Sequence, residues 1–441
     1  MNICVVALGK IGLPLAVQFA RAGHKVVGAD ISQQAVDLIN SGAAPFPGEA
    51  HLDVWLPEVV EANSLRATTD TASAVADSEV VVVVVPLVVD GDGVPDFRAL
   101  DDATVDISRG LRPGTLVSYE TTLPVGTTRH RFAAALATAT GLELGVDLFV
   151  CHSPERVFSG RIFSDLSRYP KLVGGVDRPS AERAIDFYES VLTFDDRPDL
   201  DRPNGVWDLG SAEAAELAKL AETTYRDINI AFANELATYS DRMGIDVYSV
   251  IAASNSQPFS HIHQPGIAVG GHCIPVYPRF YLAGDPHAAL PAAARTKNES
   301  MPSYAAERLA AAYGDLTGAL VAVLGAAYRG GVKETAFSGV FPLVEALKAA
   351  GATVAVHDPL YSDEELRSLG FEPYHFGDSC DAAVVQSDHA EYRDLTITDL
   401  TGVSVVVDGR RVLSERAFAA PAVTFIRIGL PTRVHERVEP S

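Results

Sequence analysis

Cys273 lies in a stretch whose residue types favour covalent chemistry. The stretch covers residues 264–278 and reads QPGIAVGGHCIPVYP. Two glycines, separated from the cysteine by one histidine, let a backbone and a ligand approach closely, and two prolines after it restrict the path of the chain. A lone cysteine in such a rigid loop, with strand–helix alternation on both sides, suggests a covalent nucleophile. The alternative is a buried structural thiol in a tight turn.

A second stretch, at the start of the chain, has the residue order of a dinucleotide site. Residues 2–8 are an apolar run typical of a buried parallel strand, and the turn GKIG at residues 9–12 opens an alanine-rich helical pattern. A second apolar run, residues 25–29, ends on Asp30. In such sites glycines permit the tight turn, the pyrophosphate lies at the helix N-terminus and the acid binds the ribose hydroxyls. The first glycine of the usual pattern is Ala7 here. Asp30 would repel a 2′-phosphate, so we expect NAD rather than NADP; alternatively, it is an ordinary strand-end residue.

The composition excludes several classes of partner. The 441 residues suffice for two or three domains, and 47% hydrophobic with 21% charged residues is ordinary for a globular protein. The net charge, 35 − 57 = −22, argues against nucleic acid or an anionic membrane as a partner. Four cysteines without a CxxC pair give neither a disulfide framework nor a metal site. With no signal-like start and no apolar run long enough to span a membrane, the chain is predicted to be cytoplasmic.

Polar loops follow several further predicted strands, at the edge where open α/β sheets bind ligands. The valine-rich residues 79–85 end before Pro86. Residues 116–119 lead into the loop ETTLPVGT at 120–127, and residues 147–151 lead into HSPER at 152–156. The first domain therefore has several candidate binding residues at one sheet edge.

Residues 211–243 predict one long helix. Ser211 can cap its start, apolar residues recur at helical spacing and Gly244 can stop it. Lys219 and Thr223 lie on one face, four residues apart. A helical lysine is most often a solvated surface charge; in this alanine- and leucine-rich stretch a functional lysine is the other possibility. A helix of this length with small and apolar faces also suits a dimer interface.

A second α/β run follows the cysteine stretch. Its predicted strands are residues 320–324, 353–357, 382–385 and 403–407, with a loop at 325–333 and a helix near 340–350. The proline-containing residues 285–302 precede it, and residues 433–441 look like a polar tail. The predicted fold class is α/β, with two Rossmann-like doubly wound parallel-sheet domains joined by a central long helical segment. The predicted bounds are 1–197, 209–305 and 315–432.

With these motifs in this order, the chain resembles the nucleotide-sugar 6-dehydrogenases, the superfamily of UDP-glucose and GDP-mannose dehydrogenases. Within it, the UDP-N-acetylmannosamine dehydrogenase branch is most similar. The likeness covers nearly the whole chain, and the ordered set is specific although each motif alone is weak. The motifs are LGKIGLP (8–14), TTLPVG (121–126), HSPERV (152–157), ELAK (216–219), TYRDIN (224–229), QPG (264–266), GGHCIP (270–275) and NESMP (298–302).

The resemblance implies an NAD-dependent, four-electron oxidation at carbon 6 of a UDP-sugar. A first hydride transfer to NAD would give an aldehyde, the Cys273 thiolate would add to it, and a second transfer would give a thioester that water hydrolyses. Lys219 would stabilise the oxyanion, and Glu155 would manage protons or position water. The implied site residues divide by task into catalysis by Cys273, Lys219, Glu155, Thr121, His272 and Thr223; NAD binding by Gly9, Lys10, Ile11, Gly12, Asp30, Pro86, Thr121 and Glu155; and substrate binding by Arg156, Lys219, Asn229, Gly270 and Arg329.

Some positions depart from the family's pattern. The acid usually found four residues after the catalytic cysteine is Tyr277, and the asparagine usually found four residues after the lysine is Thr223. The second acid of the Pro-Glu motif falls on Ser159, and the Arg-Glu-Ser of the C-terminal domain reads AFS at 336–338. Losing one oxyanion donor can cost roughly 3 kcal/mol. His272 is a better replacement base than a tyrosine; its other interpretation is a polar loop residue.

These departures keep alternatives open. The expected substrate is a UDP-N-acetylhexosamine such as UDP-ManNAc, and the nearest rival is UDP-glucose. A family member that stops at the aldehyde, or that only binds nucleotide sugar, is a further possibility. A two-electron hydroxyacid dehydrogenase would share the first domain but would not require the cysteine loop or a second nucleotide-binding domain. The expected partners are a UDP-sugar substrate and further copies of the chain, as a homodimer or higher homo-oligomer formed through the central helix.

Overall fold

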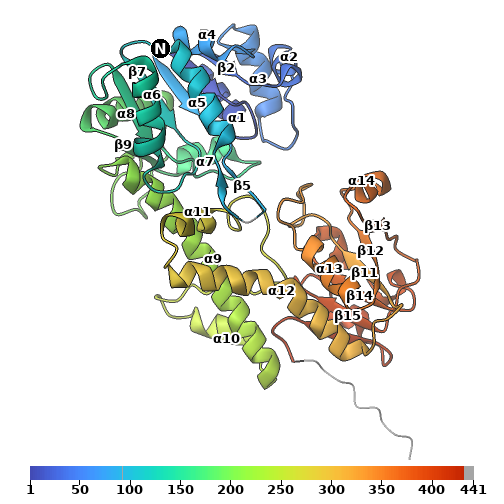
Figure 1. The fold of residues 1–441 in the computed structure, drawn as a ribbon. Helices are drawn as coiled ribbons and strands as arrows, with labels where there is room; N and C mark the ends of the chain where they lie inside the picture. The colour runs from blue at the N-terminus through green and yellow to red at the C-terminus, as the bar shows by residue number, and fades with distance from the viewer. Residues whose placement is uncertain (92, 432–441) are drawn as a thin grey trace, which may run out of the picture. The chain divides into compact units, whose positions relative to one another are not determined.

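The computed structural model describes residues 1–91 and 93–431, so the polar tail predicted at 433–441 lies outside the described residues. The chain forms two compact units (Figure 1). Of the described residues, the first comprises 1–222 and 279–286, and the second comprises 223–278 and 287–431. The three-part division predicted from the sequence stays a prediction. Over the described residues, no helix has the length and apolar character needed to cross a membrane.

The first unit is built on an eight-stranded sheet with the order β10-β9-β8-β7-β4-β1-β2-β3. The six strands from β8 to β3 are parallel and have the Rossmann order. β9 runs antiparallel to β8 and β10 runs parallel to β9, so one edge of the sheet is mixed rather than wholly parallel. The strands are β1 (Asn2–Val6), β2 (Lys25–Ala29), β3 (Leu65–Thr68), β4 (Val80–Val83), β7 (Thr115–Tyr119), β8 (Leu148–His152), β9 (Lys171–Gly175) and β10 (Val206–Asp208). A separate hairpin joins β5 (Val88–Val89) and β6 (Pro95–Asp96).

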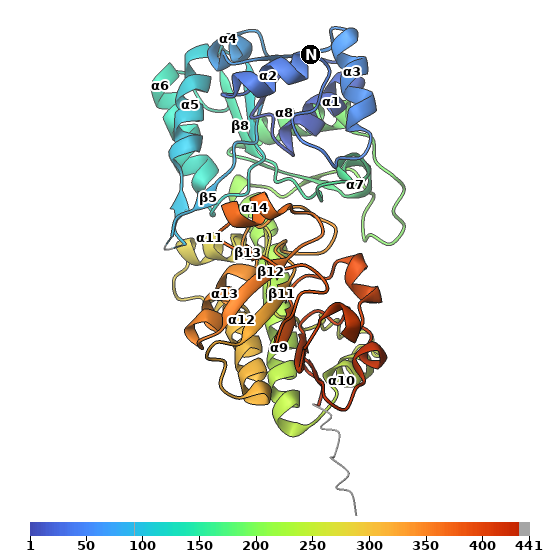
Figure 2. The same cartoon turned by 90° about the vertical axis from the view of Figure 1, so that its right-hand side faces the viewer.

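Helices cover both faces of this sheet (Figure 2). On one face Phe19 of α1 packs edge-on against Phe187 of α8, with ring centroids 5.5 Å apart. On the other face Tyr119 of β7 stacks on Phe132 of the π-helix η1 at 4.6 Å. The elements are α1 (Gly12–Arg21), α2 (Gln33–Asn40), α3 (Leu52–Glu61), α4 (Thr71–Ala76), α5 (Arg98–Gly110), η1 (Thr128–Ala133), α6 (Ala134–Thr140), α7 (Ile162–Arg168) and α8 (Arg178–Val191).

The second unit repeats the Rossmann order in a six-stranded parallel sheet, β13-β12-β11-β14-β15-β16. Its strands are β11 (Leu320–Leu324), β12 (Thr353–His357), β13 (Glu372–Pro373), β14 (Ala382–Val385), β15 (Val405–Asp408) and β16 (Thr424–Arg427). α12 packs against α13 and against β14 and β15. Its helices are α10 (Val247–Ser254), α12 (Ala289–Tyr313), α13 (Val340–Ala349) and α14 (Asp363–Ser368).

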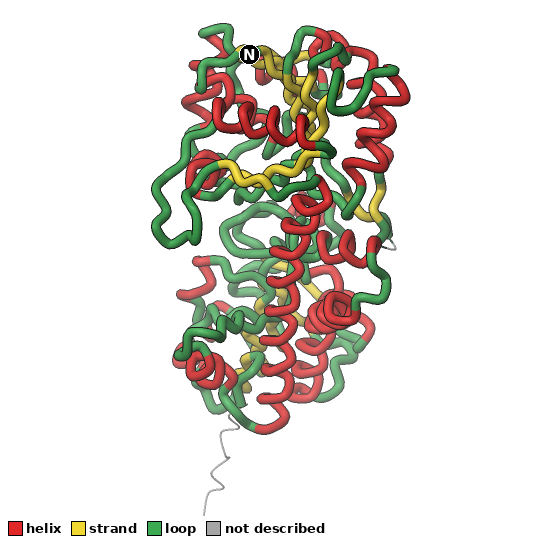
Figure 3. The backbone as a smooth tube through the Cα atoms, turned by 90° about the vertical axis from the view of Figure 1, so that its left-hand side faces the viewer, coloured by secondary structure: helices red, strands yellow, loops and turns green. Residues whose placement is uncertain are grey.

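The long helix predicted at 211–243 is confirmed. α9 (Ala212–Met243) runs for 32 residues without a break (Figure 3). The Ser211 hydroxyl accepts the Ala214 N–H at 3.1 Å, and Gly244 ends the helix with φ 69°. Both predicted end signals are therefore present.

Several predicted boundaries are wrong. β1 ends at Val6 rather than residue 8, because Ala7 has φ 74° and leaves the extended conformation. β4 covers four of the seven residues predicted at 79–85, and β15 begins at Val405 rather than at 403. The segment 285–302, for which no element was predicted, is mostly helical: α12 begins at Ala289 and continues through Pro302.

Candidate active site

The turn after β1 is compact because of two backbone features. Ala7 has a positive φ, which costs a residue with a side chain about 1 kcal/mol or more. A Cβ on Gly12 would lie only 1.9 Å from the Ala7 carbonyl oxygen, so only glycine fits where α1 begins. The turn leads directly into α1, and the unpaired N–H groups of a helix start are a binding site for phosphate.

Asp30 ends β2 beside this turn. Its Oδ2 accepts the Leu8 N–H at 2.7 Å, and its Oδ1 accepts the Ser32 N–H at 2.9 Å. The side chain is half-buried, and a carboxylate with about four lone-pair sites can still accept from ribose hydroxyls. Val84 donates its N–H to the Val6 carbonyl at 3.0 Å, which brings the chain before the exposed Pro86 to the same sheet edge.

The loop after β7 reaches this edge through Thr121. The Thr121 hydroxyl donates to the Val85 carbonyl at 2.7 Å and so ties the loop to the chain after β4. The neighbouring Thr122 is buried, and within the described residues its hydroxyl makes no hydrogen bond. Thr121 was predicted from the sequence and Thr122 was not, although both belong to the same motif.

Glu155 follows β8 and is held by a lysine that sequence analysis missed. The Lys171 Nζ donates to Glu155 Oε2 at 2.8 Å and to Glu120 Oε2 at 2.7 Å. Glu120 could have been found, because it lies directly after a buried strand, at the edge where open α/β sheets bind ligands. Lys171 gave no such signal, since it begins a short strand after an ordinary polar stretch.

The start of α9 is fixed to the first unit by a buried acid. Glu216 accepts the Gly126 N–H at 2.5 Å and both the N–H and the hydroxyl of Thr128, at 2.8 and 2.7 Å. Burial raises the pKa of Glu216 to about 7, although these hydrogen bonds oppose the rise. Lys219, one turn further along the helix, is 8% exposed, so the interpretation as a solvated surface charge is wrong.

Two further predicted residues lie on α9 or contact it. Thr223 is buried one turn after Lys219. Arg156 forms an ion pair with Glu222, with Nε and Oε2 2.9 Å apart. This ion pair already engages Arg156 within the first unit.

In the second unit, the cysteine loop packs on the loop after β11. The Gly271 N–H donates to the Ala336 carbonyl at 2.8 Å. A Cβ on Gly270 would lie 2.6 Å from the Tyr328 Cβ, so the two loops touch where that glycine lies. Cys273 is exposed, so the interpretation as a buried structural thiol is wrong.

His272 has a partner that the sequence did not suggest. Its Nε2 lies 2.5 Å from Glu334 Oε1, in the loop after β11. The imidazole is therefore engaged in a second link between the cysteine loop and that loop. A role for His272 as a base stays a prediction.

The carboxyl edge of the second sheet lies next to these loops. Asp358, after β12, accepts the Ala326 and Ala327 N–H groups at 2.8 Å each and pairs with the buried His389 at 3.1 Å. Arg329 lies exposed in the same loop, its guanidinium 5.6 Å from the Tyr328 ring centroid. This edge is where an open parallel sheet binds ligands.

A buried polar network connects α9 with the cysteine loop. Asp227 forms a two-bond ion pair with Arg295, at 2.7 and 2.5 Å. Asn298 donates to Asp227 and accepts from Asn234, whose oxygen accepts the Gly266 N–H at 2.9 Å. The network fixes the start of the cysteine loop against both long helices of the second unit.

Asn229 has its side-chain amide engaged by the chain itself. Its nitrogen donates to the His261 carbonyl at 2.7 Å, and its oxygen accepts the His263 N–H at 2.9 Å. In this structure the residue orders the loop before the cysteine stretch. Its predicted contact with substrate stays a prediction.

The structure thus brings the predicted residues together in two groups, each within one unit. The first unit holds Gly9, Lys10, Ile11, Gly12, Asp30, Pro86, Thr121, Glu155, Arg156 and Lys219. The second unit holds Thr223, Asn229, Gly270, His272, Cys273 and Arg329.

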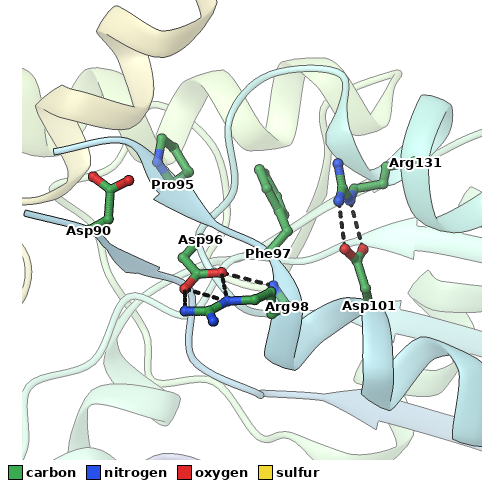
Figure 4. Close-up of a pocket in the computed structure, with 7 residues that line it drawn as sticks. All are labelled: Asp90, Pro95, Asp96, Phe97, Arg98, Asp101 and Arg131. Carbon is green, nitrogen blue, oxygen red and sulfur yellow. Dashed lines mark hydrogen bonds and ion pairs between the residues drawn. The ribbon is translucent and has the colours of Figure 1, made fainter. Parts of the chain in front are cut away.

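A separate hollow of about 390 Å³ lies beside the β5–β6 hairpin of the first unit (Figure 4). Its charged groups include two ion pairs, Arg98 with Asp96 and Arg131 with Asp101, each at 2.5 Å. None of the predicted site residues lines it. It therefore does not bear on the chemistry of the two edges. Its lining residues are Asp90, Pro95, Asp96, Phe97, Arg98, Asp101 and Arg131.

The first edge fits NAD on the residues themselves. The glycine-only position at the start of α1 permits close approach of a pyrophosphate, and Asp30 retains acceptor sites for ribose hydroxyls. A Rossmann unit of this kind, followed by a second Rossmann unit with an exposed cysteine in a neighbouring loop, fits the class of NAD-dependent dehydrogenases.

Comparison with known proteins gives the family. Profiles of three domains of the UDP-glucose/GDP-mannose dehydrogenase family match the chain: the NAD binding domain at residues 1–192, the central domain at 213–299 and the UDP binding domain at 322–415. The chain belongs to this family, and it is an NAD-dependent nucleotide-sugar dehydrogenase.

Two relatives match over almost their full length. A UDP-N-acetyl-D-mannosamine dehydrogenase of Pyrococcus horikoshii is 36% identical, with 98% of this chain and 99% of the relative covered. An NDP-N-acetyl-D-galactosaminuronic acid dehydrogenase of Ralstonia solanacearum is 32% identical, with 95% and 98% covered.

Solved structures agree. The structure of the Pyrococcus horikoshii UDP-D-ManNAc dehydrogenase is similar with a TM-score of 0.85 at 34% identity, covering 97% of this chain and 99% of that one. A UDP-glucose dehydrogenase from Pyrobaculum islandicum gives 0.83 at 27% identity, covering 97% of each chain. The predicted resemblance and fold class are confirmed.

Proposed function

We propose that this protein oxidises the 6-hydroxyl of a UDP-N-acetylhexosamine, such as UDP-ManNAc, to the carboxylate through a thioester on Cys273. The observation that carries the proposal is the exposed thiol of Cys273 in a glycine loop packed beside the ligand edge of the second sheet. When bound, NAD supplies the hydride acceptor for both oxidations. The choice of an N-acetylhexosamine rests on the names of the two relatives at 36% and 32% identity.

The residues of the second unit have the covalent and substrate-holding tasks. The Cys273 thiolate adds to the carbonyl carbon of the aldehyde, so the reactive intermediate stays attached until water releases the acid. Gly270 allows the loop to approach the ligand edge, and Arg329 offers a guanidinium to the pyrophosphate. The Asp227–Arg295 network holds the start of the loop, so the thiol is positioned by a buried support.

The residues of the first unit have the electrostatic and proton-transfer tasks. A buried Lys219 is suited to stabilise an oxyanion, because a fixed cation in a dry site costs little reorganisation. Glu155 is held by Lys171 and would accept a proton from the hydroxyl or from water. The hydroxyl of Thr122, in addition to that of Thr121, is available to orient water. Gly9, Lys10, Ile11, Gly12, Asp30 and Pro86 would hold the cofactor.

We further propose that the chain pairs with a second copy through α9. In the second unit this helix exposes four large apolar side chains at helical spacing, each at least half exposed: Tyr225, Phe232, Tyr239 and Met243. Such a stripe on one helix marks an interaction surface. We expect a dimer at micromolar concentration by light scattering, and a monomer for Phe232→Asp with its secondary structure unchanged. A wild-type monomer would exclude this interface. The predicted cytoplasmic location stays a prediction.

The test of the reaction is the amount of NADH formed per sugar consumed. UDP-ManNAc, UDP-GalNAc, UDP-GlcNAc and UDP-glucose are compared, with Cys273→Ser as the control. Two NADH per sugar, with release of the carboxylate blocked in the variant, supports the proposal and names the substrate. One NADH with an aldehyde product means that Tyr277 and Thr223 mark a reaction that stops halfway. Turnover of UDP-glucose alone would replace the proposed substrate.

A further inference from the structure

Two carboxylates and one ammonium group form a buried cluster at the carboxyl edge of the first sheet. The Lys171 side chain is 4% exposed, that of Glu120 0% and that of Glu155 11%. The ammonium lies 2.7 Å from Glu120 Oε2 and 2.8 Å from Glu155 Oε2, so it bridges the two acids. The remaining oxygen of Glu155 accepts the Arg156 N–H at 2.8 Å. Both oxygens of Glu155 are therefore fixed.

Tyr188 of α8 closes the cluster from the face of the sheet. Its hydroxyl donates to Glu120 Oε1 at 2.7 Å, and the Lys171 Nζ lies 4.8 Å from its ring centroid. Behind it, the Ser118 hydroxyl lies 2.7 Å from the Tyr188 hydroxyl, and the Cys151 thiol donates to Ser118 at 3.2 Å. The titratable groups that interact with Glu120 are Lys171 of β9, Glu155 of the loop after β8, Tyr188 of α8 and Cys151 of β8. His152, at the end of β8, is buried near Lys171; burial, with the Lys171 charge adding to it, lowers the pKa of His152 to about 3.

The charges of the cluster do not balance when every group has its ordinary charge. Two carboxylates and one ammonium leave one negative charge in a buried site, which is costly unless a proton is bound. Burial raises the pKa of Glu120 to about 7, with Lys171 opposing and Glu155 adding to the rise. For Glu155 burial also raises the pKa, but the ammonium of Lys171 and the hydrogen bonds outweigh burial and hold the pKa below its ordinary value. The extra proton therefore resides on the Glu120 side.

We propose that Glu120 and Lys171 are positioning residues for Glu155, forming a cluster that keeps the Glu155 carboxylate ionised and oriented toward the ligand edge. The inference rests on the proposed function for the role of Glu155. It adds that the two acids have different protonation states: Glu120 holds the proton that the buried cluster requires, and Glu155 stays ionised. The reaction of the proposed function releases protons, so Glu155 must be ionised at neutral pH in order to accept them.

The experiment compares the pH dependence of turnover in three variants. Glu120→Gln keeps the shape and fixes the cluster in the equivalent of its protonated state. The amide oxygen can accept from Lys171, and the amide nitrogen donates to the Tyr188 hydroxyl, which then donates to Ser118. The activity of this variant at pH 6 should stay within about threefold of the wild type, while an inflection near pH 7 disappears. Lys171→Met leaves two facing carboxylates without a cation, which must then share a proton. Its activity at pH 6 should fall roughly 30-fold or more and recover partly as the pH rises.

The matched control is Glu182→Gln on α8, which removes one acid of an exposed ion pair in the same unit. It should leave the pH profile unchanged. A Glu120→Gln profile that superimposes on that of the wild type would overturn the proposal. So would a Lys171→Met loss that is the same at every pH, because a purely structural defect has no reason to depend on the charge of Glu155.

A measurement without turnover separates this inference from the proposed function. In the unfolded chain Glu120 loses its proton near its ordinary pKa of 4.5, whereas in the folded protein it keeps the proton up to about pH 7. The free energy of unfolding therefore falls as the pH rises from 4.5 to about 7. Glu120→Gln should reduce that fall in denaturant titrations at pH 5.5 and 8, and Glu182→Gln should not. If the wild type oxidises no nucleotide sugar while the unfolding result holds, the proposed function fails and the cluster stands. An unchanged fall in Glu120→Gln overturns the cluster.

Discussion

The six parallel strands of the first sheet have the same order as the six strands of the second, but the loops after their first strands differ. In the first unit β1 connects to α1 through a short turn, in which only glycine fits at residue 12. In the second unit the chain between β11 and α13 extends over residues 325–339 and packs against the cysteine loop. The acid after the second strand differs as well. Asp30 keeps open acceptor sites, whereas Asp358 is 3% exposed and bound by backbone N–H groups and His389.

This difference shows how one topology serves two nucleotides. A strand order fixes where a ligand edge lies, but the length of the first loop and the partners of the following acid decide what that edge holds. The first edge retains free groups for a cofactor. At the second edge the acid, Asp358, has a structural role, and the cysteine loop lies beside it.

Removal of the structural acid should give the largest effect. Asp358→Ala leaves two backbone N–H groups and His389 without their buried partner, so we expect a loss of about 3–5 kcal/mol in the stability of the second unit. Hydrogen exchange of β11, β12 and β14 measures it. Asp363→Ala, which removes a half-exposed acid of α14, serves as the control and should change stability by less than about 1 kcal/mol. Equal effects of both would mean that Asp358 is not a support.

Removal of the binding acid should instead affect the cofactor. Asp30→Ala is expected to weaken NAD binding by roughly 10- to 100-fold, because the ribose hydroxyls lose a charged acceptor. Stability should fall by about 1 kcal/mol, since only two local N–H bonds are lost. Titration calorimetry with NAD and thermal unfolding give the two numbers. NAD affinity that is unchanged would place the ribose elsewhere.

The two units should respond to pH in opposite directions. In the first unit, burial raises the pKa of Glu216 from 4.5 to about 7, so the folded state holds a proton that the unfolded chain has lost. Stability therefore falls as the pH rises through this interval, by at most about 1.4 kcal/mol per pH unit. In the second unit, burial raises the pKa of Asp358, but its hydrogen bonds to His389 and to the loop outweigh burial and lower it below 3.8. That stabilisation is present above pH 3.8 and is lost as the pH falls below it.

Hydrogen exchange, corrected for intrinsic rates and followed separately in β7 and β11, measures the fall of the first unit between pH 5 and 7.5. In that range the second unit should stay constant, because its loss begins only below pH 3.8. Glu216→Gln should reduce the fall in the first unit, to which Glu120 also contributes, and leave the second unit unchanged. A parallel loss in both units would contradict the assignment.

The smallest expected effect concerns the turn after β1. Ala7→Gly removes the cost of a side chain at φ 74°, and we expect a gain of about 0.5–1 kcal/mol, because the greater freedom of glycine in the unfolded chain offsets part of the relief. Denaturant unfolding followed by a probe in the first unit checks it. Phe337→Gly is the counterpart in the second unit, because Phe337 also has a positive φ of 50°.

Much of the fold was predictable because strongly periodic segments carry their own signal. The apolar strands 25–29, 320–324, 353–357 and 382–385 have the predicted bounds, and the capped helix over 211–243 is present. The predicted end of a strand was wrong where a single backbone angle determined it, as for β1 at Ala7. Helix α12 was not predicted because a proline such as Pro302 disfavours the interior of a helix. Tertiary packing stabilises the helix despite it.

The partners of the site residues were not predictable from local pattern. Lys171 and Glu155 are 16 residues apart, and His272 and Glu334 are 62 residues apart. Such pairs depend on sheet register and loop packing, which a motif does not encode. The roles of the individual site residues therefore remain predictions, whereas the edges on which they lie are described.

The burial of the other thiols makes Cys273 a natural handle for chemical labelling. All four cysteines lie within the described residues, and Cys4, Cys151 and Cys380 are buried. Burial raises the pKa of the Cys4 and Cys151 thiols to about 12, which leaves them un-ionised and unreactive at neutral pH. A thiol-directed dye or spin label would therefore attach to the unmodified wild-type chain at one place, next to its own ligand edge. The protein carries a single-site reporter without any cysteine having to be introduced or removed.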